Sequence, residues 1–153
     1  LHCEKQNSLK KAVIAILKPE SSSLNIYNYI GIIIWIFGFS IEVISDLQKN
    51  KFKKSQNTNE TFISTGLWSK SRHPNYFGEI TLWSGIYIIS LSSFSGIDYL
   101  SIISPIFVFI LLTRMSGINM LEKIADDRYK HLDEYLEYKE NTPKLIPYKF
   151  FIK

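Results

Sequence analysis

Residues 29–39 read YIGIIIWIFGF, and this stretch decides the fold. It lies inside a longer apolar segment, residues 24–45, in which nothing from Ile30 to Ile41 is charged. A bilayer core about 30 Å thick requires roughly 20 apolar residues in helical form, with about 17 as the practical minimum. The stretch therefore predicts a membrane-spanning helix over residues 24–45.

Two further apolar runs follow, at residues 76–94 and 98–115. The first carries Glu79 near its start, and the second ends at Arg114 and contains Pro105, which membrane helices tolerate. Three such runs in 153 residues leave too little polar sequence to cover them in water. We therefore predict an all-α, polytopic membrane helix bundle with about three transmembrane helices, embedded in a lipid bilayer.

The charges of the loops predict an orientation. Residues 92–98 contain no Lys or Arg, whereas residues 46–75 contain six and the chain from Arg114 onward contains eight. Cytosolic loops carry the excess of basic residues, so residues 46–75 and the C-terminal tail are expected in the cytosol. The lysines before residue 20 oppose this orientation. Either residues 11–17 are the remnant of another membrane element, or the preference of basic residues for the cytosolic side is overridden in this segment.

The polar segments between and after the runs predict a loop and a surface helix. Residues 50–65 are rich in Lys, Asn, Thr and Ser and are expected to form a mobile cytosolic loop. Apolar residues then recur at helical spacing over residues 119–139, which predicts one amphipathic helix on the membrane surface or capping the bundle. We expect residues 1–153 to form a single membrane domain of a longer protein.

Composition excludes several functions. Cys3 is the only cysteine, so neither an intrachain disulfide nor a cysteine-built zinc site is possible. His2 and His131 have no metal-ligand spacing to other residues, and no metal site is expected. The net charge of +4 is mild and its basic residues flank apolar runs, so we expect no nucleic-acid partner. There is no Gly-rich phosphate loop, which excludes a Rossmann-type nucleotide site.

Residues 72–79, RHPNYFGE, are the densest cluster of functional groups in the chain. Pro74 restricts His73 and is suited to open a helix, so Arg72 and His73 are expected beside a helix N-terminus that attracts phosphate. Glu79 lies one turn past Asn75, inside the membrane, where a carboxylate is costly unless it is paired or functional. Snorkelling at the interface is the alternative reading of this cluster.

Other polar residues are expected at the same cytosolic end. Glu42 and Asp46 lie four residues apart on one helix face, where like charges repel unless a hydrogen-bond donor lies between them. They are suited to accept hydrogen bonds from ribose hydroxyls or a carboxamide, or else they form a hydrated helix end. Four more residues are candidates for a cytosolic pocket, with plain packing as the alternative: Arg114, Glu122, Tyr135 and Tyr138.

Four ordered blocks resemble the steroid 5-alpha-reductase-like membrane superfamily, and most closely its branch known as a domain of unknown function. They are GLWSKSRHPNYFGE at 66–79 with Trp83, GFSIEVISD at 38–46 with Gln48 and Phe52, RMSGINMLEK at 114–123, and YLEY at 135–138 before LIP at 145–147. The resemblance covers about residues 30–148. It implies a membrane bundle whose C-terminal half binds NADPH from the cytosolic side.

The resemblance also implies a reaction and a set of cofactor contacts. The reaction is hydride transfer from NADPH to a carbon–carbon double bond of a lipid or steroid-like enone, in the endoplasmic reticulum if the source is eukaryotic. The residue that polarises the carbonyl belongs to an N-terminal half outside these residues, so the catalytic residues are unknown. The implied cofactor contacts are Glu42, Asp46, Arg72, His73, Asn75, Tyr76, Glu79, Arg114, Glu122, Tyr135 and Tyr138.

A second membrane family shares part of this pattern. Isoprenylcysteine carboxyl methyltransferases and related phospholipid methyltransferases also carry an Arg-His-Pro-x-Tyr turn and bind S-adenosylmethionine there. The Phe77-Gly78-Glu79 sequence and the Glu42 and Asp46 pair favour the reductase branch. A non-catalytic membrane protein that keeps the fold is the third alternative. The substrate and the oligomeric state stay undetermined at this stage.

Overall fold

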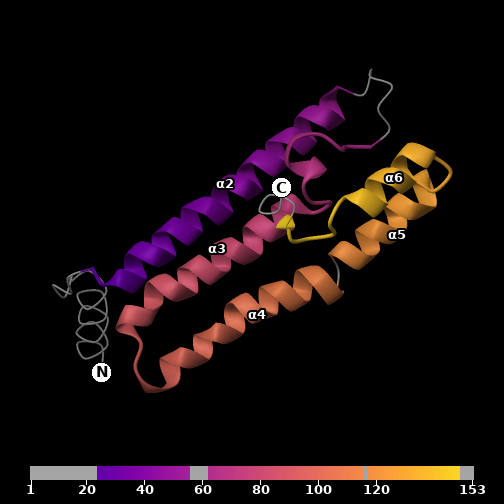
Figure 1. Ribbon diagram of the computed structural model, residues 1–153. Coiled ribbons are helices and arrows are strands. Elements are labelled where there is room, and N and C mark those ends of the chain that lie inside the picture. Colours follow the sequence, from indigo (N-terminus) through magenta and orange to yellow (C-terminus); the bar gives the residue numbers. More distant parts are fainter. Residues whose placement is uncertain (1–23, 56–61, 116, 149–153) are drawn as a thin grey trace, which may run out of the picture.

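The computed structural model describes residues 24–55, 62–115 and 117–148, and their regular elements are all helices (Figure 1). The predicted all-α fold is thus confirmed. The elements in chain order are α2 (Ile26–Lys54), the short η1 (Gly66–Ser69), α3 (Pro74–Ser90), η2 (Leu91–Ser93), η3 (Gly96–Ile102), α4 (Ile103–Ile110), the π-helical turn η4 (Leu111–Met115), α5 (Ile118–Tyr129) and α6 (Asp133–Asn141).

The helix α2 extends well past the predicted end at residue 45. It continues to Lys54, so residues 50–54 are helical and their assignment to a loop was wrong. Only part of the remaining predicted loop, residues 62–65, lies among the described residues. The last turn of α2 carries Lys51, Lys53 and Lys54, which suits the negative end of a helix dipole. A solvated basic turn therefore lengthens the helix beyond its apolar part.

The prediction of one amphipathic helix over residues 119–139 was also wrong. The structure has two helices, α5 and α6, which turn back on each other (Figure 1). The break falls at Leu132, whose backbone is extended with φ −102° and ψ 119°. Asp133 and Glu134 then occupy the first turn of α6, where acidic residues favour a new helix start. The Asp126 carboxylate holds the pair together by accepting hydrogen bonds from Tyr135 and Lys139.

In the part of the chain that the structure describes, two helical runs are long and apolar enough to cross a membrane, namely α2 and the run that begins at Gly96 and includes α4. Their apolar side chains are largely exposed, with Ile33 at 66% and Ile103 at 61%. Among the described residues, the large apolar side chains that are buried are Trp68, Ile118 and Tyr135. Exposed apolar surface of this extent marks a membrane or partner contact in a folded protein. With 17 residues, α3 is at the lower limit for a span, so the predicted span over residues 76–94 stays a prediction.

Four glycines bring α2 and α3 into backbone contact. Gly31 and Gly38 on α2 face Gly85 and Gly78 on the antiparallel α3. A Cβ at Gly38 would lie 2.5 Å from the Leu82 nitrogen, and one at Gly78 would lie 2.6 Å from the Glu42 nitrogen. Small residues permit such close approach of membrane helices, where van der Waals packing supplies much of the attraction. The pair is therefore held at a separation that no larger side chain permits.

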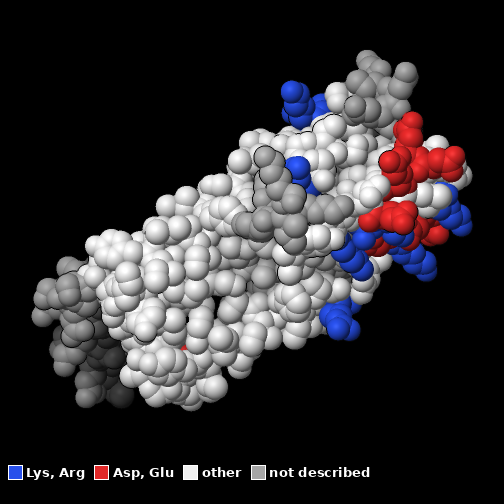
Figure 2. All heavy atoms as spheres, in the orientation of Figure 1, with Lys and Arg blue, Asp and Glu red and all other residues white. Residues whose placement is uncertain are grey.

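Charged residues gather at one end of the molecule. Figure 2 shows acidic and basic side chains over the α5 and α6 end, whereas most of the length of α2, α3 and α4 is white on the face drawn. At the opposite end of α2, the Asn28 side chain donates to Ile89 O at 2.7 Å and to Ser92 Oγ at 2.9 Å. The acidic residue Asp98, whose carboxylate accepts hydrogen bonds from Ser95, lies in the turn at this end. The structure thus has an apolar middle and one end that is rich in charged residues, where the candidate site lies.

Candidate functional site

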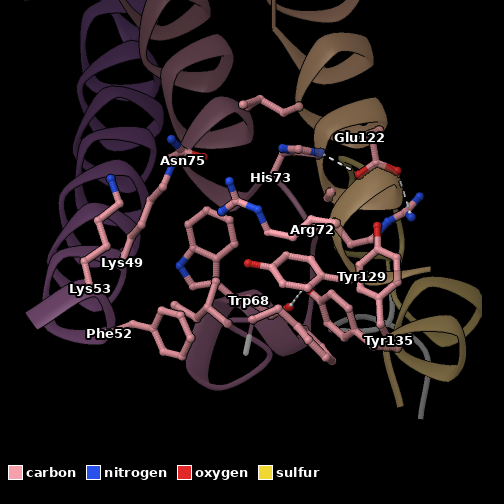
Figure 3. Close-up of a pocket in the computed structure, with 16 residues that line it drawn as sticks. Lys49, Phe52, Lys53, Trp68, Arg72, His73, Asn75, Glu122, Tyr129 and Tyr135 are labelled. Atoms are coloured by element: carbon pink, nitrogen blue, oxygen red, sulfur yellow. Dashed lines mark hydrogen bonds and ion pairs between the residues drawn. The ribbon is translucent and has the colours of Figure 1, made fainter. Parts of the chain in front are cut away.

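An open pocket of about 300 Å³ lies at the charged end, between the extended part of α2 and the α5–α6 pair. In Figure 3, Lys49, Phe52 and Lys53 approach it from α2, while Glu122 and Tyr129 approach from α5 on the opposite side. The segment before α3 forms the wall between them. The pocket therefore combines residues that are far apart in the sequence.

The chain around Arg72 is held by the C-terminal segment. The Arg72 amide donates to Pro143 O at 2.9 Å, and the Ser71 hydroxyl donates to Leu145 O at 2.8 Å. Pro74 then starts α3 at the position where a missing N–H costs no hydrogen bond. His73 is the N-cap residue of this helix, with its side chain buried. Arg72 and His73 are thus fixed at the N-terminus of α3, as the sequence predicted.

Glu122 pairs with both of these residues. Its Oε1 lies 2.8 Å from His73 Nε2, and its Oε2 lies 2.8 Å from Arg72 Nη1. Burial acts to raise the pKa of Glu122, but the His73 hydrogen bond and the nearby positive charges outweigh it, so the pKa lies below its usual value. Glu122 is therefore ionised at neutral pH and joins α5 to the start of α3.

Arg72 retains unused hydrogen-bond donors. Its Nε is buried and has no hydrogen-bond partner in the described part of the chain. Its Nη1 contacts Glu122 as an ion pair but without hydrogen-bond geometry. Buried donors are normally satisfied, and each unsatisfied one costs free energy. An anionic ligand in the pocket would supply acceptors for these N–H groups.

Aromatic rings form the floor of the pocket. Phe62 packs against Tyr129, Tyr135 and Tyr138 with ring centroids 5.4–5.9 Å apart. The Tyr138 hydroxyl donates to Trp68 O at 2.7 Å, and burial raises the pKa of Tyr138. Burial, followed by the hydrogen bond to Asp126, raises the pKa of Tyr135 in the same direction. Both phenols therefore stay neutral and serve as donors and flat packing surfaces.

The loop before α3 is attached to α2 through Trp68. Its indole Nε1 donates to Ser45 O at 3.1 Å, and Lys49 Nζ lies 5.5 Å from the centre of its ring. The Gln48 side chain accepts a hydrogen bond from the Leu67 amide at 3.0 Å. Gly66 has φ +64°, and a Cβ there would collide with the Gln48 side chain, so glycine is required. The pocket wall is thereby built on the rigid end of α2.

The pocket is positively charged. Lys49, Lys53, Arg72 and Arg128 line it, and Glu122 is the acidic lining residue, so four positive charges less one negative charge leave +3 without counting His73. Glu122 is already paired with Arg72 and His73. Lys53 has no ion pair within the described residues. These features favour an anionic ligand with a flat ring.

The structure brings together six of the eleven predicted site residues. Those that line the pocket are Arg72, His73, Asn75, Glu122, Tyr135 and Tyr138. Asn75 also donates to Asp46 Oδ1 at 3.3 Å, which connects the pocket to a second polar group formed by Glu42, Asp46, Tyr76 and Glu79 along the α2–α3 contact. Arg114 is exposed on η4 and does not line the pocket. The predicted cofactor contacts of all eleven residues stay predictions.

Sequence reasoning missed several lining residues. Six residues that line the pocket were not named as candidates: Lys49, Lys53, Phe62, Trp68, Arg128 and Tyr129. The two lysines are four residues apart, which places them on one helix face, but only if α2 continues past residue 45. Because the predicted helix ended at residue 45, the spacing of the two lysines on one helix face was not considered.

The structure thus combines helices that are apolar enough to span a membrane with a cationic and aromatic pocket at their charged end. A family model described as "Protein of unknown function (DUF1295)" matches residues 8–142, and the chain belongs to this family. The family is a steroid 5-alpha-reductase-like membrane family. No curated protein and no solved structure matches the chain.

Proposed function

We propose that the protein is a membrane reductase that binds NADPH in the charged pocket and reduces a carbon–carbon double bond of a lipid or steroid-like enone. The observation that carries the proposal is the cationic, aromatic pocket built around Arg72 at the N-terminus of α3. Membership of a reductase-like family supports it. This chain supplies the cofactor-binding half, and the proposal assigns no catalytic residue within it.

The phosphates are proposed to bind between Lys53, Arg72 and the first turn of α3. Asn75 and Tyr76 follow the helix start, and N–H groups of a first helical turn have no partner within the helix. Such N-termini bind phosphate through these N–H groups and the helix dipole. The unused donors of Arg72 add charge-assisted hydrogen bonds. NADPH would supply the hydride, and these residues would hold and orient it.

The flat rings of the cofactor are proposed to pack on the tyrosines. Offset stacking on an aromatic side chain stabilises a planar ligand ring, and the Phe62 cluster offers several such surfaces. The pocket volume of about 300 Å³ is at the lower end of the range of about 300–1,000 Å³ for ligand sites. One end of the dinucleotide therefore enters this pocket, and the other extends toward Asn75 and Asp46.

A titration tests the cofactor. The purified protein should bind NADPH more tightly than NADH, because the 2′-phosphate adds charge that Lys53 and Arg72 can pair. Lys53→Ala should weaken NADPH binding about tenfold, the scale of one lost charge-assisted contact, and should weaken NADH binding less, because NADH lacks the 2′-phosphate. Lys51→Ala is the matched control, since Lys51 is exposed on the same helix and does not line the pocket.

S-adenosylmethionine belongs in the same titration. If it binds and neither nicotinamide nucleotide does, the methyltransferase alternative replaces the reductase proposal. If none of the three binds, the pocket is not a cofactor site of either kind. Equal effects of the two lysine variants would show that Lys53 acts only through the overall charge.

We further propose a multi-pass protein with its charged end in the cytosol, in the endoplasmic reticulum if the source is eukaryotic. Single cysteines at Asn50 and at Ile97, both exposed, test the orientation when Cys3 is replaced by serine. The cysteine at position 50 should react with an impermeant maleimide from the cytosolic side, and that at position 97 should react only after permeabilisation. Cytosolic labelling at position 97 would contradict the orientation.

A further inference from the structure

A second cavity lies in the apolar middle of the molecule, between α3 and the η3–α4 segment. It is a groove of about 350 Å³ with an almost wholly apolar lining. Ile80, Ser84 and Tyr87 line it from α3, and Ile102, Ile106 and Phe109 line it from the other side. The Ser84 hydroxyl donates to Ile80 O at 2.8 Å, so it is already satisfied within its own helix. The groove is therefore suited to hydrocarbon and not to a polar ligand.

The groove exists because α3 packs differently on its two sides. Toward α2, glycines bring the two backbones into contact and leave no space. Toward α4, the facing residues are bulky and include Pro105, so the two helices stay apart. In the membrane, water is excluded from such an apolar space, and a dry apolar cavity of about 150 Å³ is already large enough to bind benzene. A groove of about 350 Å³ therefore accommodates a larger hydrocarbon group.

The groove points toward the charged pocket. Ile80 and Tyr87 are seven residues apart, which is close to two helical turns, so they lie along one face of α3, and His73 is the N-cap residue just before this helix. His73 lines the charged pocket, whereas Ile80 and Tyr87 line the groove. At a rise of 1.5 Å per residue, Ile80 lies roughly 10 Å deeper in the membrane than His73. A molecule lying in the groove would have one end near the pocket.

We propose that this groove binds the apolar part of the lipid substrate, a hydrocarbon chain or fused ring system, with its reactive end directed toward His73. The proposal rests on the proposed function in that it takes the substrate to be a lipid. It adds the place where that lipid lies and the face by which it enters, which is the gap between α3 and α4. Neither the glycine contact of α2 with α3 nor the charged pocket offers a comparable apolar space.

Photolabelling tests the groove. The probe is a long-chain trans-enone with a diazirine at its apolar end, applied to the whole chain in phosphatidylcholine nanodiscs, with labelled peptides mapped by mass spectrometry. Ile106→Trp places a larger side chain in the groove and should reduce labelling about tenfold, because less of the groove stays free for the probe. Ile103→Trp is the matched control, since Ile103 is exposed on the same helix and lines no part of the groove. It should leave labelling unchanged.

Two measurements keep the outcomes distinct. An excess of unlabelled enone should abolish groove labelling of the unaltered protein, a result that does not depend on any variant. NADPH affinity, measured in parallel, should be the same in both tryptophan variants. Equal labelling of the two variants, or labelling spread over the outer face of α2, would overturn the groove proposal.

The two proposals can fail separately. If NADPH binds but labelling does not depend on Ile106, the groove is wrong and the proposed cofactor site stands. If NADPH does not bind but Ile106→Trp still blocks labelling selectively, the groove stands as a lipid site and the reductase proposal fails.

Discussion

Replacing Gly38 with leucine is expected to separate α2 from α3 and to prevent stable folding. A Cβ at Gly38 would lie 2.5 Å from the Leu82 nitrogen and 2.7 Å from the Gly78 oxygen, so even the first carbon meets backbone that cannot move aside. Overpacking of a flexible core costs about 1–3 kcal/mol. Here the obstruction is a helix backbone, and we expect a loss above this range.

The measurement is unfolding of the purified protein in mixed detergent micelles, followed by circular dichroism. Gly38→Ala should fall between the unaltered protein and Gly38→Leu, because it adds only the colliding Cβ. Ile33→Leu is the control on the same helix, where the side chain is 66% exposed, and should have almost no effect. A Gly38→Leu protein as stable as this control would show that the close helix contact does not hold the fold.

Replacing Glu122 with leucine is expected to have the second largest effect. The change leaves Arg72 and His73 without their acceptor, and both side chains are largely buried, at 13% and 8% exposure. Removing one partner of a buried ion pair typically costs about 3–5 kcal/mol, because the remaining charge stays buried. Glu122→Gln should cost less, since its amide oxygen still accepts a hydrogen bond from His73.

The same unfolding assay measures this loss, with Glu137→Leu as the control. Glu137 is exposed on α6, so its replacement should change stability little. The pKa of Glu122 is lowered by folding, so its ion pairs stabilise the native state above the ordinary glutamate pKa of about 4.3. This contribution is lost as the pH falls through the lower pKa of the folded state. The stability gap between the unaltered protein and Glu122→Gln should therefore close in acid.

The local sequence patterns placed two of the candidate residues correctly in the fold, whereas their role in a site stays a prediction. The RHPNYFGE motif placed Arg72 and His73 beside a helix N-terminus, and Pro74 does begin α3. This agreement has a local cause, because proline restricts its neighbour and suits the first helical position. Helix ends were less accurate, since a polar but helix-forming segment such as residues 46–54 has no apolar period to mark its end.

The partners across the pocket could not be inferred from the sequence. The contact of Glu122 with His73 joins residues 49 positions apart, and Tyr138 contacts Trp68 across 70 positions. The loop that breaks residues 119–139 into two helices decides the second of these contacts, because a single straight helix would carry Tyr135 and Tyr138 away from Trp68 and Phe62. The aromatic floor thus depends on the turn at Leu132.

The sequence by itself determined that the chain is helical and suited to a membrane, because uncharged apolar runs of such length can satisfy their backbone only as helices in lipid. It also predicted which end is charged, since most of the basic residues lie in residues 46–75 and from Arg114 onward. The tertiary structure alone decided the separation of the helices. The glycines close the α2–α3 side and bulky residues open the α3–α4 side, and both effects depend on which helix faces meet.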